Sequence, residues 1–400
     1  MSLDRAVNIL MLTDVYFPRV NGVSTSIRTH VRELTARGHA VTLVAPEYPG
    51  VGAETDADAC ELIRLPSRQI FFDPEDRLVR GAALRTVLDR LSTRPWDVVH
   101  VHTPFQAHRL GTWLRRRTGC AVVETYHTYF EQYVGHYLPW LPAAALRSLA
   151  RTLSRHLCAG TDHLIVPSTE MDAVLRGYGI ATASTVIPTG IHPEEFTGGD
   201  GVRFRLAHGI AVDRPTVVTV SRLAREKNIA FLIEVVAVLQ PAIPDLLFII
   251  AGEGPDAQRL QALAAARGVQ DNVRFFGNLD RHTALLDCYR AGDAFVFASP
   301  TETQGLVLLE ALALGVPVVS TAVMGTASVL AGAQGAEVAP ENVADFAAVL
   351  GKLLRDGELR RTLSAAGPRD AARWSAAALV DRVEDLYAAL ALLSSARRPA

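Results

Sequence analysis

The sequence predicts an α/β protein with two doubly wound domains, each built on a parallel sheet. The length of 400 residues is enough for two or three domains of roughly 150 residues each. Short apolar runs alternate with amphipathic segments along the chain, a pattern typical of parallel strands that helices cover on both faces. Hydrophobic residues make up 49% of the chain and charged residues 20%, which supports sizeable cores and excludes a disordered chain.

Ten apolar runs are expected to form the strands, five in each half of the chain. They are residues 7–12, 40–45, 98–102, 121–125 and 163–167, then 216–220, 246–251, 273–276, 294–297 and 316–320. Amphipathic helices are expected between them, for example at 25–37, 81–91, 257–267 and 306–314.

The segment 186–201 is expected to join the two domains because it is rich in glycine, proline and carboxylates. The predicted domains are residues 1–192 and 193–372. The remaining residues, 373–400, contain a predicted helix at 373–393 that could pack back on the first domain. One large sheet with a long surface loop is the alternative, but ten strands strain a single open sheet.

The composition excludes several classes of protein. Lys and Arg number 40 against 42 Asp and Glu, and this net charge of −2 argues against a nucleic-acid partner. The four cysteines lie far apart without metal-ligand spacing, which favours free thiols in a reducing cytosol. The first residues do not resemble a signal peptide, and no apolar run reaches about 18 residues. A cytoplasmic chain without a transmembrane helix is therefore expected.

Two loops of the first half carry candidate ligand-binding residues, because ligands of open α/β sheets bind beyond the carboxyl ends of the strands. Asn21 and Gly22 precede a helix predicted from near Ser24, whose N-terminus would attract an anion such as a diphosphate. An ordinary loop with Ser24 as N-cap is the alternative. His127 follows the predicted strand 121–125 and could contact a sugar hydroxyl or a developing charge, although many histidines are structural.

In the second half, Arg222 and Lys227 follow the predicted strand 216–220 and could clamp two phosphates. Lys227 is one of only two lysines among 40 Lys and Arg residues, which indicates that a compact ammonium group is needed there. A solvated pair at the start of a helix is the alternative. Gly252 and Gly254 follow the next strand and would let the backbone approach a ligand closely.

The segment SPTETQGLVLLEALALGVPVVST carries two glutamates, Glu302 and Glu310, in an E-x7-E arrangement. Glu302 lies in a predicted loop and Glu310 in a helix that Gly305 opens, so both carboxylates could accept hydrogen bonds from vicinal hydroxyls of one ligand. The helix N-terminus at Gly305 and Leu306 would face phosphates. Two solvated glutamates are the alternative, but Glu310 lies among leucines, where an unpaired carboxylate is costly.

Together these motifs resemble the family 4 retaining glycosyltransferases of the GT-B fold. The matching segments follow in the family's order: DVYFPRVNGVS, HVHTPF, YHTYFEQY, VIPTGI, SRLAREKNI, AGEGP, FFGNL and the E-x7-E segment. The resemblance implies two Rossmann-like domains that face each other across a cleft. It also implies an enzyme that moves a hexose from UDP- or GDP-hexose to an acceptor hydroxyl, without a metal or other cofactor.

The resemblance further implies a role for each motif residue. At the reacting centre, His127 would lie beside the donor sugar, Arg222 and Lys227 would stabilise the leaving diphosphate, and Glu302 would contact sugar hydroxyls. The other implied donor contacts are phosphate at Gly22, Gly305 and Leu306, ribose at Glu310, and the vicinity of the base at the loop 277–281 that Gly277 opens, with Gly252 as a further donor-binding residue. One departure is Asn21–Gly22, where the family often has two glycines.

The region 100–158 carries seven arginines against two glutamates, a local charge of +5. Arg147, Arg151 and Arg155 repeat at every fourth residue beside a row of leucines, and Trp140 precedes them. This pattern predicts docking on an anionic membrane surface, or else an ordinary surface helix with its leucines in the core.

The stretch YHTYFEQYVGHYLP resembles the bacterial subgroup of glucosyl- and mannosyltransferases that act on lipids. We therefore expect a peripheral enzyme on the cytoplasmic face of the inner membrane, with a membrane lipid or glycolipid as acceptor. The alternatives are a nucleotide-sugar 2-epimerase, a non-catalytic sugar-nucleotide-binding module, or a transferase with a soluble or polysaccharide acceptor.

Overall fold

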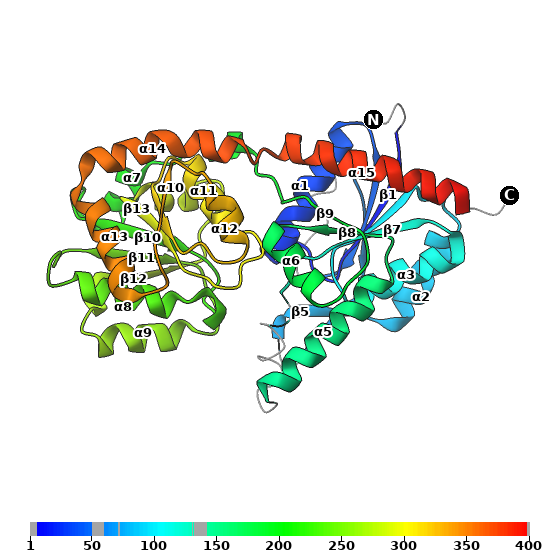
Figure 1. Cartoon of the computed structure of the whole chain (residues 1–400), viewed down its shortest axis with the longest axis horizontal. Helices are drawn as coiled ribbons and strands as arrows, with labels where there is room; N and C mark the ends of the chain where they lie inside the picture. The colour runs from blue at the N-terminus through cyan, green and yellow to red at the C-terminus, as the bar shows by residue number, and fades with distance from the viewer. Residues whose placement is uncertain (1–5, 50–59, 71–72, 130, 132–141, 398–400) are drawn as a thin grey trace. The chain divides into compact units, whose positions relative to one another are not determined.

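The computed structural model describes residues 6–49, 60–70, 73–129, 131 and 142–397 (Figure 1). The chain divides into two compact units, which we call unit 1 (Met1–Gly190 with Ala376–Ala400) and unit 2 (Ile191–Ser375). Each unit contains one parallel sheet with helices on both faces, so the predicted α/β class with two doubly wound sheets is confirmed.

The sheet of unit 1 has seven strands in the order β3-β2-β1-β6-β7-β8-β9, and every neighbouring pair is parallel. The strands are β1 (Asn8–Leu12), β2 (Ala40–Pro46), β3 (Glu61–Leu65), β6 (Val98–Val101), β7 (Ala121–Thr125), β8 (His163–Val166) and β9 (Ser184–Val186). An antiparallel hairpin, β4 (Ser67–Ile70) with β5 (Asp73–Val79), forms a separate two-stranded sheet.

Helices cover both faces of this sheet. Those of unit 1 are α1 (Gly22–Ala36), α2 (Gly81–Ser92), α3 (Gln106–Thr118), α5 (Ala143–Ala159), α6 (Thr169–Gly177) and α15 (Ala376–Arg397). One apolar core packs the sheet against α1 and α15, through residues such as Ile27, Val31 and Val383. A second core lies on the other face against α2 and α3, with Leu91 and Leu114 fully buried.

The last helix, α15, begins at Ala376 rather than at residue 373 as expected. The reason is that Ile191 donates a backbone hydrogen bond to the carbonyl of Trp374 and pairs with Ser375 in a parallel bridge, which holds the chain extended there. From Ala376 onward the chain belongs to unit 1, where Val380, Val383, Tyr387 and Leu390 join the core.

The sheet of unit 2 has six parallel strands in the order β12-β11-β10-β13-β14-β15. The strands are β10 (Thr216–Val220), β11 (Leu247–Ala251), β12 (Val273–Gly277), β13 (Ala294–Phe297), β14 (Val318–Ser320) and β15 (Ala336–Val338). The helices are α7 (Gly201–Ala207), α8 (Ile229–Leu239), α9 (Ala257–Ala266), α10 (Ala284–Arg290), α11 (Leu306–Ala313), α12 (Gly325–Leu330), α13 (Val343–Arg355) and α14 (Gly357–Ala372). Three 3-10 turns complete the unit: η2 (Pro193–Phe196), η3 (Arg225–Lys227) and η4 (Gln270–Asn272).

The strand order creates one topological switch point in each sheet. In unit 1 the chain runs outward from β1 to β2 and β3, then returns to pair β6 on the other side of β1. In unit 2 it runs from β10 to β11 and β12, then returns to pair β13 with β10. Loops that leave neighbouring strands in opposite directions open a crevice at their carboxyl ends, which is where ligands of such sheets bind.

Candidate active site

At the switch point of unit 2, Lys227 and Glu302 form an ion pair. Lys227 ends η3 in the loop after β10, and Glu302 lies in the loop after β13. A second bond joins the same loops, because the Ser299 hydroxyl donates to the carbonyl of Glu226 at 2.9 Å. Two residues that lie far apart in the sequence thus meet where the topology predicts a ligand.

Arg222 lies in the same loop as Lys227 and is partly buried. The loop after β11 packs directly on it: the amide of Leu223 donates to the carbonyl of Glu253 at 2.8 Å, and the amide of Asp256 donates to the carbonyl of Leu223 at 2.9 Å. Backbone hydrogen bonds to the loop after β11 therefore hold the loop that carries both predicted cations, Arg222 and Lys227.

Gly252 and Gly254 make this support possible. Their φ angles are 127° and 158°, and a Cβ atom at Gly252 would lie 2.0 Å from the carbonyl oxygen of Ser221. At Gly254 it would lie 2.3 Å from the carbonyl oxygen of Leu223. The close approach that these glycines permit is thus to the cation-bearing loop of the protein itself. The amide of Gly252 also donates to the carbonyl of Gly277 at 2.7 Å.

Glu310 is buried on α11 and both of its carboxylate oxygens are bonded. The Arg281 guanidinium donates to Oε1 at 2.8 Å, and the Tyr289 hydroxyl donates to Oε2 at 2.7 Å. The Glu310 carboxylate raises the pKa of Arg281, while burial first and Glu310 second raise the pKa of Tyr289. The sequence indicated that Glu310 needs a partner, but neither Arg281 nor Tyr289 was predicted as one, since only the folded sheet brings the loop after β12 and helix α10 to α11.

Gly305 and Leu306 mark the start of α11, at the carboxyl end of β13. Gly305 is the N-cap with φ 92°, in the left-handed region that favours glycine. Helix α12 fastens the loop before it, because the amide of Gly325 donates to the carbonyl of Glu302 at 2.8 Å. The N-terminus of α11 thus lies beside the loop that carries Glu302, and a helix N-terminus attracts an anion.

In unit 1, Gly22 is the first residue of α1, and Asn21 is the N-cap. The expected start near Ser24 was therefore too late, because the Asn21 side chain accepts the amide hydrogen of Ser24 at 2.8 Å and closes the first turn earlier. A Cβ atom at Gly22 would have no neighbour within 4 Å, so the backbone there is open to approach.

His127 follows β7 and is partly buried. Its Nε2 atom lies 3.2 Å from Nδ1 of His102, which follows β6. Burial first, and the neighbouring His30 second, lower the pKa of His127 to about 3. His127 is therefore a neutral hydrogen-bonding group at physiological pH.

His30, His100 and His102 form the one group of described residues whose potential metal ligands lie close together, within 4.8 Å of one another. Nδ1 of His100 lies 2.5 Å from the Tyr387 hydroxyl, and Nε2 lies 2.6 Å from the Thr125 hydroxyl. Because both nitrogens of His100 are engaged, the group offers two available ligands rather than three, and we read it as a hydrogen-bonded cluster.

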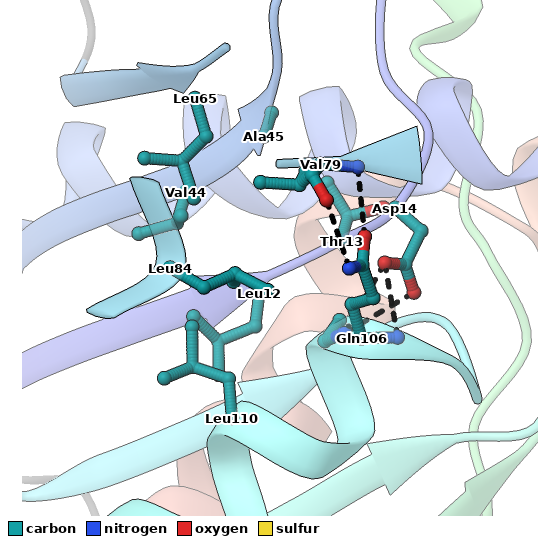
Figure 2. A pocket seen from close by; sticks show the side chains of 11 residues that line it. Leu12, Thr13, Asp14, Val44, Ala45, Leu65, Val79, Leu84, Gln106 and Leu110 are labelled. Atoms are coloured by element: carbon teal, nitrogen blue, oxygen red, sulfur yellow. Dashed lines mark hydrogen bonds between the residues drawn. The ribbon is translucent and has the colours of Figure 1, made fainter. Parts of the chain in front are cut away.

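Asp14 ties together the two loops at the switch point of unit 1 (Figure 2). Its carboxylate accepts hydrogen bonds from the Thr103 hydroxyl at 2.7 Å and from the amides of Gln106 and Ala107 at 3.1 and 3.2 Å. Burial raises the pKa of Asp14 in spite of these bonds. The adjoining cavity, whose other walls include Leu12, Val44 and Leu110, measures about 10 Å³ and has room for about one water molecule.

Arg147, Arg151 and Arg155 are exposed and line one hollow on α5, together with Ala144 and Ser148. The leucine row does not lie wholly in the core: Leu157 is buried, but Leu149 is 43% exposed beside the arginines. Trp140 lies outside the described residues.

The arginine row is partly anchored on the following helix. Arg155 Nε donates to the carbonyl of Tyr178 at 2.5 Å, and the Arg151 guanidinium lies 5.4 Å from the centre of the Tyr178 ring. These contacts hold the basic face of α5 in a defined orientation.

Comparison with known proteins identifies two family models that together span both units. The model "Glycosyltransferase Family 4" matches residues 20–195, and the model "Glycosyl transferases group 1" matches residues 203–370. The alpha-monoglucosyldiacylglycerol synthase of Streptococcus pneumoniae is 34% identical over 321 residues, which cover 78% of this chain and 71% of that protein.

A second relative is the GDP-mannose-dependent alpha-(1-6)-phosphatidylinositol monomannoside mannosyltransferase of Mycobacterium tuberculosis. It is 27% identical over 330 residues, covering 78% of this chain and 80% of that protein. Among solved structures, the sucrose-phosphate synthase of Thermosynechococcus elongatus superposes with a TM-score of 0.78 at 22% identity, covering 96% of this chain and 99% of that one. The last likeness concerns the fold alone.

Proposed function

The chain belongs to glycosyltransferase family 4, whose members are retaining enzymes of the GT-B fold, and from this premise we propose that it transfers a hexose from UDP- or GDP-hexose to a hydroxyl group of a membrane lipid. The observation that carries the proposal is the Lys227–Glu302 pair at the switch point of unit 2. It places an ammonium group beside a carboxylate that can accept hydrogen bonds from hydroxyl groups. A nucleotide sugar bound there would present its diphosphate to the first and its sugar to the second.

The donor half of the proposal rests on charge. Cleavage of the anomeric C–O bond leaves negative charge on the diphosphate, which Arg222, Lys227 and the N-terminus of α11 would stabilise. These fixed positive groups could stabilise the leaving diphosphate in the way that a metal ion does in other enzymes, so we propose a metal-independent transfer. Glu302 and Glu310 would accept hydrogen bonds from the sugar and ribose hydroxyls, respectively. The loop from Gly277 to Arg281 would border the base, and Gly252 would act on donor binding through the loop of Arg222 and Lys227, against which it packs.

The transfer step follows from retention of configuration. The acceptor oxygen attacks the anomeric carbon on the face from which the diphosphate leaves, so that one C–O bond forms as the other breaks. The departing diphosphate takes the proton of the acceptor hydroxyl, which balances the step without a protein base. Neutral His127 would hold the sugar by a hydrogen bond, and Gly22 would admit the diphosphate to the backbone of unit 1.

The acceptor half rests on α5 and on the lipid-directed names of the two relatives. Arg147, Arg151 and Arg155 are exposed beside the exposed Leu149, as in helices that lie on a bilayer surface. An arginine near an anionic surface contributes about 1 kcal/mol to binding. Among the described residues, no helix is long and apolar enough to cross a bilayer. We propose peripheral association with the cytoplasmic face of the inner membrane.

The donor and acceptor are tested together by incubation with UDP-glucose or GDP-mannose and vesicles that contain diacylglycerol or phosphatidylinositol. We expect nucleotide release with formation of a glycolipid. Lys227→Ala should reduce the rate by about 100-fold or more, since one charged group of the diphosphate site is lost. Lys352→Ala is the matched control, because this other lysine is exposed on α13. Release of an epimerised sugar would instead indicate a nucleotide-sugar 2-epimerase. Glycosylation of soluble acceptors only would indicate a transferase with a soluble or polysaccharide acceptor.

Membrane association is tested by flotation with vesicles that contain phosphatidylglycerol. Replacing Arg147, Arg151 and Arg155 by glutamine should abolish co-flotation, whereas the same replacement of Arg109, Arg116 and Arg117 should leave it largely intact. The control removes the same charge from exposed positions on α3. Equal loss in both variants would mean that only net charge matters and that α5 is not the docking surface.

A further inference from the structure

Four histidines gather at the carboxyl end of the sheet of unit 1. His30 comes from α1, His100 from β6, and His102 and His127 from the loops after β6 and β7. The ring centroids of His100 and His102 lie 3.9 Å apart, and those of His30 and His102 lie 5.9 Å apart. His102 is thus packed between the core of the unit and His127.

All four rings are neutral at physiological pH. Burial is the main cause of the lowered pKa in each case: about 4 for His30, about 3 for His127, and well below the ordinary value for His100 and His102. A neutral imidazole carries one proton, on Nδ1 or on Nε2, so a hydrogen bond between two neutral imidazoles needs a protonated nitrogen on one ring and an unprotonated nitrogen on the other.

The bond between His102 and His127 has good geometry for one N–H···N interaction. Nδ1 of His102 lies 3.2 Å from Nε2 of His127, and the ring planes differ by only 21°. The ring centroids lie 5.5 Å apart, about the N···N distance plus the distance of each nitrogen from its own ring centre, so the two nitrogens face each other end-on. One of the two rings must donate and the other must accept.

The surroundings of His102 decide which ring donates. Within the part of the chain that the structure describes, the Nε2 atom of His102 is buried and has no hydrogen-bond partner. If His127 donated, the proton of His102 would move to Nε2 and become a buried, unpaired N–H, which proteins avoid more strictly than an unpaired acceptor. The proton of His102 therefore belongs on Nδ1, from which it is donated to His127.

We infer that His102 is a positioning residue for hexose transfer, because its Nδ1–H bond to Nε2 of His127 fixes the His127 ring and leaves the His127 proton on Nδ1. With Nε2 accepting this bond, the proton of His127 lies on Nδ1. A protonated Nδ1 donates a hydrogen bond to a sugar oxygen and cannot remove a proton from the acceptor. The inference rests on the proposed function in one respect, the position of His127 beside the donor sugar.

The rest of the cluster keeps His102 in place. His100, directly against it, is held at both nitrogens by Tyr387 on α15 and Thr125 on β7. A substitution at His102 should therefore alter the bond to His127 without displacing the strand end. This stability of the surroundings makes conservative variants informative.

The test compares His102→Asn, His102→Gln and His102→Leu. The amide nitrogen of Asn reaches about the position of Nδ1, that of Gln reaches about the position of Nε2, and Leu has no donor. We expect the transfer rate to fall about 10- to 100-fold in the Gln and Leu variants and to be largely restored in the Asn variant. His163→Leu is the control, because His163 lies in the same sheet but bonds to Thr185 instead. Thermal melts establish that each variant is folded.

The second readout is the tautomer itself, measured on the whole protein by ¹⁵N NMR of histidine side chains. We expect wild-type His127 to be protonated at Nδ1 and the Leu variant to lose this preference. Protonation of His127 at Nε2, or equal turnover in all three variants, would overturn the inference. The NMR measurement needs no nucleotide sugar. A protein that shows the expected tautomer but transfers no hexose would therefore refute the proposed function, while the inferred hydrogen bond between His102 and His127 would remain supported.

Discussion

At the scale of single residues, the buried carboxylate of Glu310 depends on its two partners. Arg281 supplies charge and the fully buried Tyr289 supplies a short hydrogen bond, and each uses a different carboxylate oxygen. Each oxygen keeps a further lone pair, which under the proposed function would accept a hydrogen bond from a ribose hydroxyl. The pair of partners therefore holds Glu310 ready for a ligand without saturating it.

Removing the Tyr289 hydroxyl tests this arrangement. In Tyr289→Phe the Oε2 atom loses its donor, so we expect the KM for the nucleotide sugar to rise about 10-fold, corresponding to about 1.4 kcal/mol, with a smaller change in kcat. Tyr178→Phe is the matched control, because it removes a tyrosine-to-glutamate bond, to Glu131, from unit 1. Steady-state kinetics decide the matter, and equal KM values in both variants would contradict this role for Tyr289.

The buried His30 gives a pH dependence of stability. Its pKa of about 4 in the folded protein lies below its ordinary value of 6.5, so the unfolded chain takes up a proton that the folded chain does not. The contribution of His30 to stability is fully present above pH 6.5 and is lost as the pH falls toward 4, by at most about 1.4 kcal/mol per pH unit.

The variant His30→Gln cannot titrate at this position. Its free energy of unfolding should therefore fall less steeply than that of the wild type between pH 6.5 and 4, while the two curves run parallel above pH 7. Urea unfolding at a series of pH values measures both slopes. Identical slopes below pH 6.5 would mean that His30 keeps an ordinary pKa in the folded protein.

At the scale of elements, the loops of unit 2 form one connected support for the proposed diphosphate site. The loop after β11 underlies the loop after β10, and α12 fastens the loop after β13. The glycines at the contact points are required because a side chain would meet backbone atoms, which cannot move aside as a flexible side chain can.

Gly254→Ala tests the loop-to-loop support. The new methyl group would collide with the carbonyl of Leu223, so we expect a loss of about 3 kcal/mol or more in stability together with weaker nucleotide binding. Gly268→Ala is the control: its φ is 70° but no atom lies within 4 Å of the added carbon, so it should cost only about 1 kcal/mol. Chemical denaturation and calorimetric titration with UDP and GDP measure the two effects. Similar losses in both variants would mean that backbone strain alone, rather than the collision, is responsible.

At the scale of the whole molecule, the last helix completes the first unit. Helix α15 follows unit 2 in the sequence, yet its buried face packs against α1 and the sheet of unit 1. Hydrogen bonds reinforce the packing, because the Ser394 hydroxyl accepts from the amide of Ala121 at 2.7 Å and donates to the carbonyl of Asp97 at 2.6 Å. The core of unit 1 thus combines α15 with elements that lie more than 200 residues earlier in the sequence.

Leu390→Ala should therefore weaken unit 1 and spare unit 2. Deleting this buried side chain is expected to cost about 2–5 kcal/mol. Hydrogen exchange measured by mass spectrometry should show faster exchange in β1 and β6, with β10 and β13 unchanged. Faster exchange throughout, or only in β10 and β13, would show that α15 does not act on unit 1 alone.

Much of the fold was predictable from local patterns. All ten predicted strands are present, because strands buried on both faces read as continuous apolar runs. The strands that were missed are β3, β9, β15 and the β4–β5 hairpin. The three missed strands of the two large sheets, β3, β9 and β15, all lie at sheet edges. β9 and β15 are only three residues long and β3 is half-buried, so their apolar signal in the sequence is weak.

The candidate site was predictable only in part. Lys227, Glu302 and Glu310 could be chosen from strand-end positions and unusual residue choice, since a scarce lysine and a carboxylate among leucines are informative within the sequence alone. Their partners could not be chosen in this way. Arg281, Tyr289 and His102 have ordinary neighbours in the sequence, and their importance appears only from what they contact in space.

The sequence by itself therefore determined the α/β class, the positions of the main strands, and the loops in which the candidate ligand-binding residues lie, because these depend on periodicity and on local residue choice. The tertiary structure alone decided that Lys227 meets Glu302, that Glu310 is held by Arg281 and Tyr289, and that α15 returns to unit 1. The tautomer of His127 belongs with these, since it is inferred from a buried nitrogen without a partner. Such pairings join residues far apart along the chain, and strand order and burial, rather than any local pattern, bring them together.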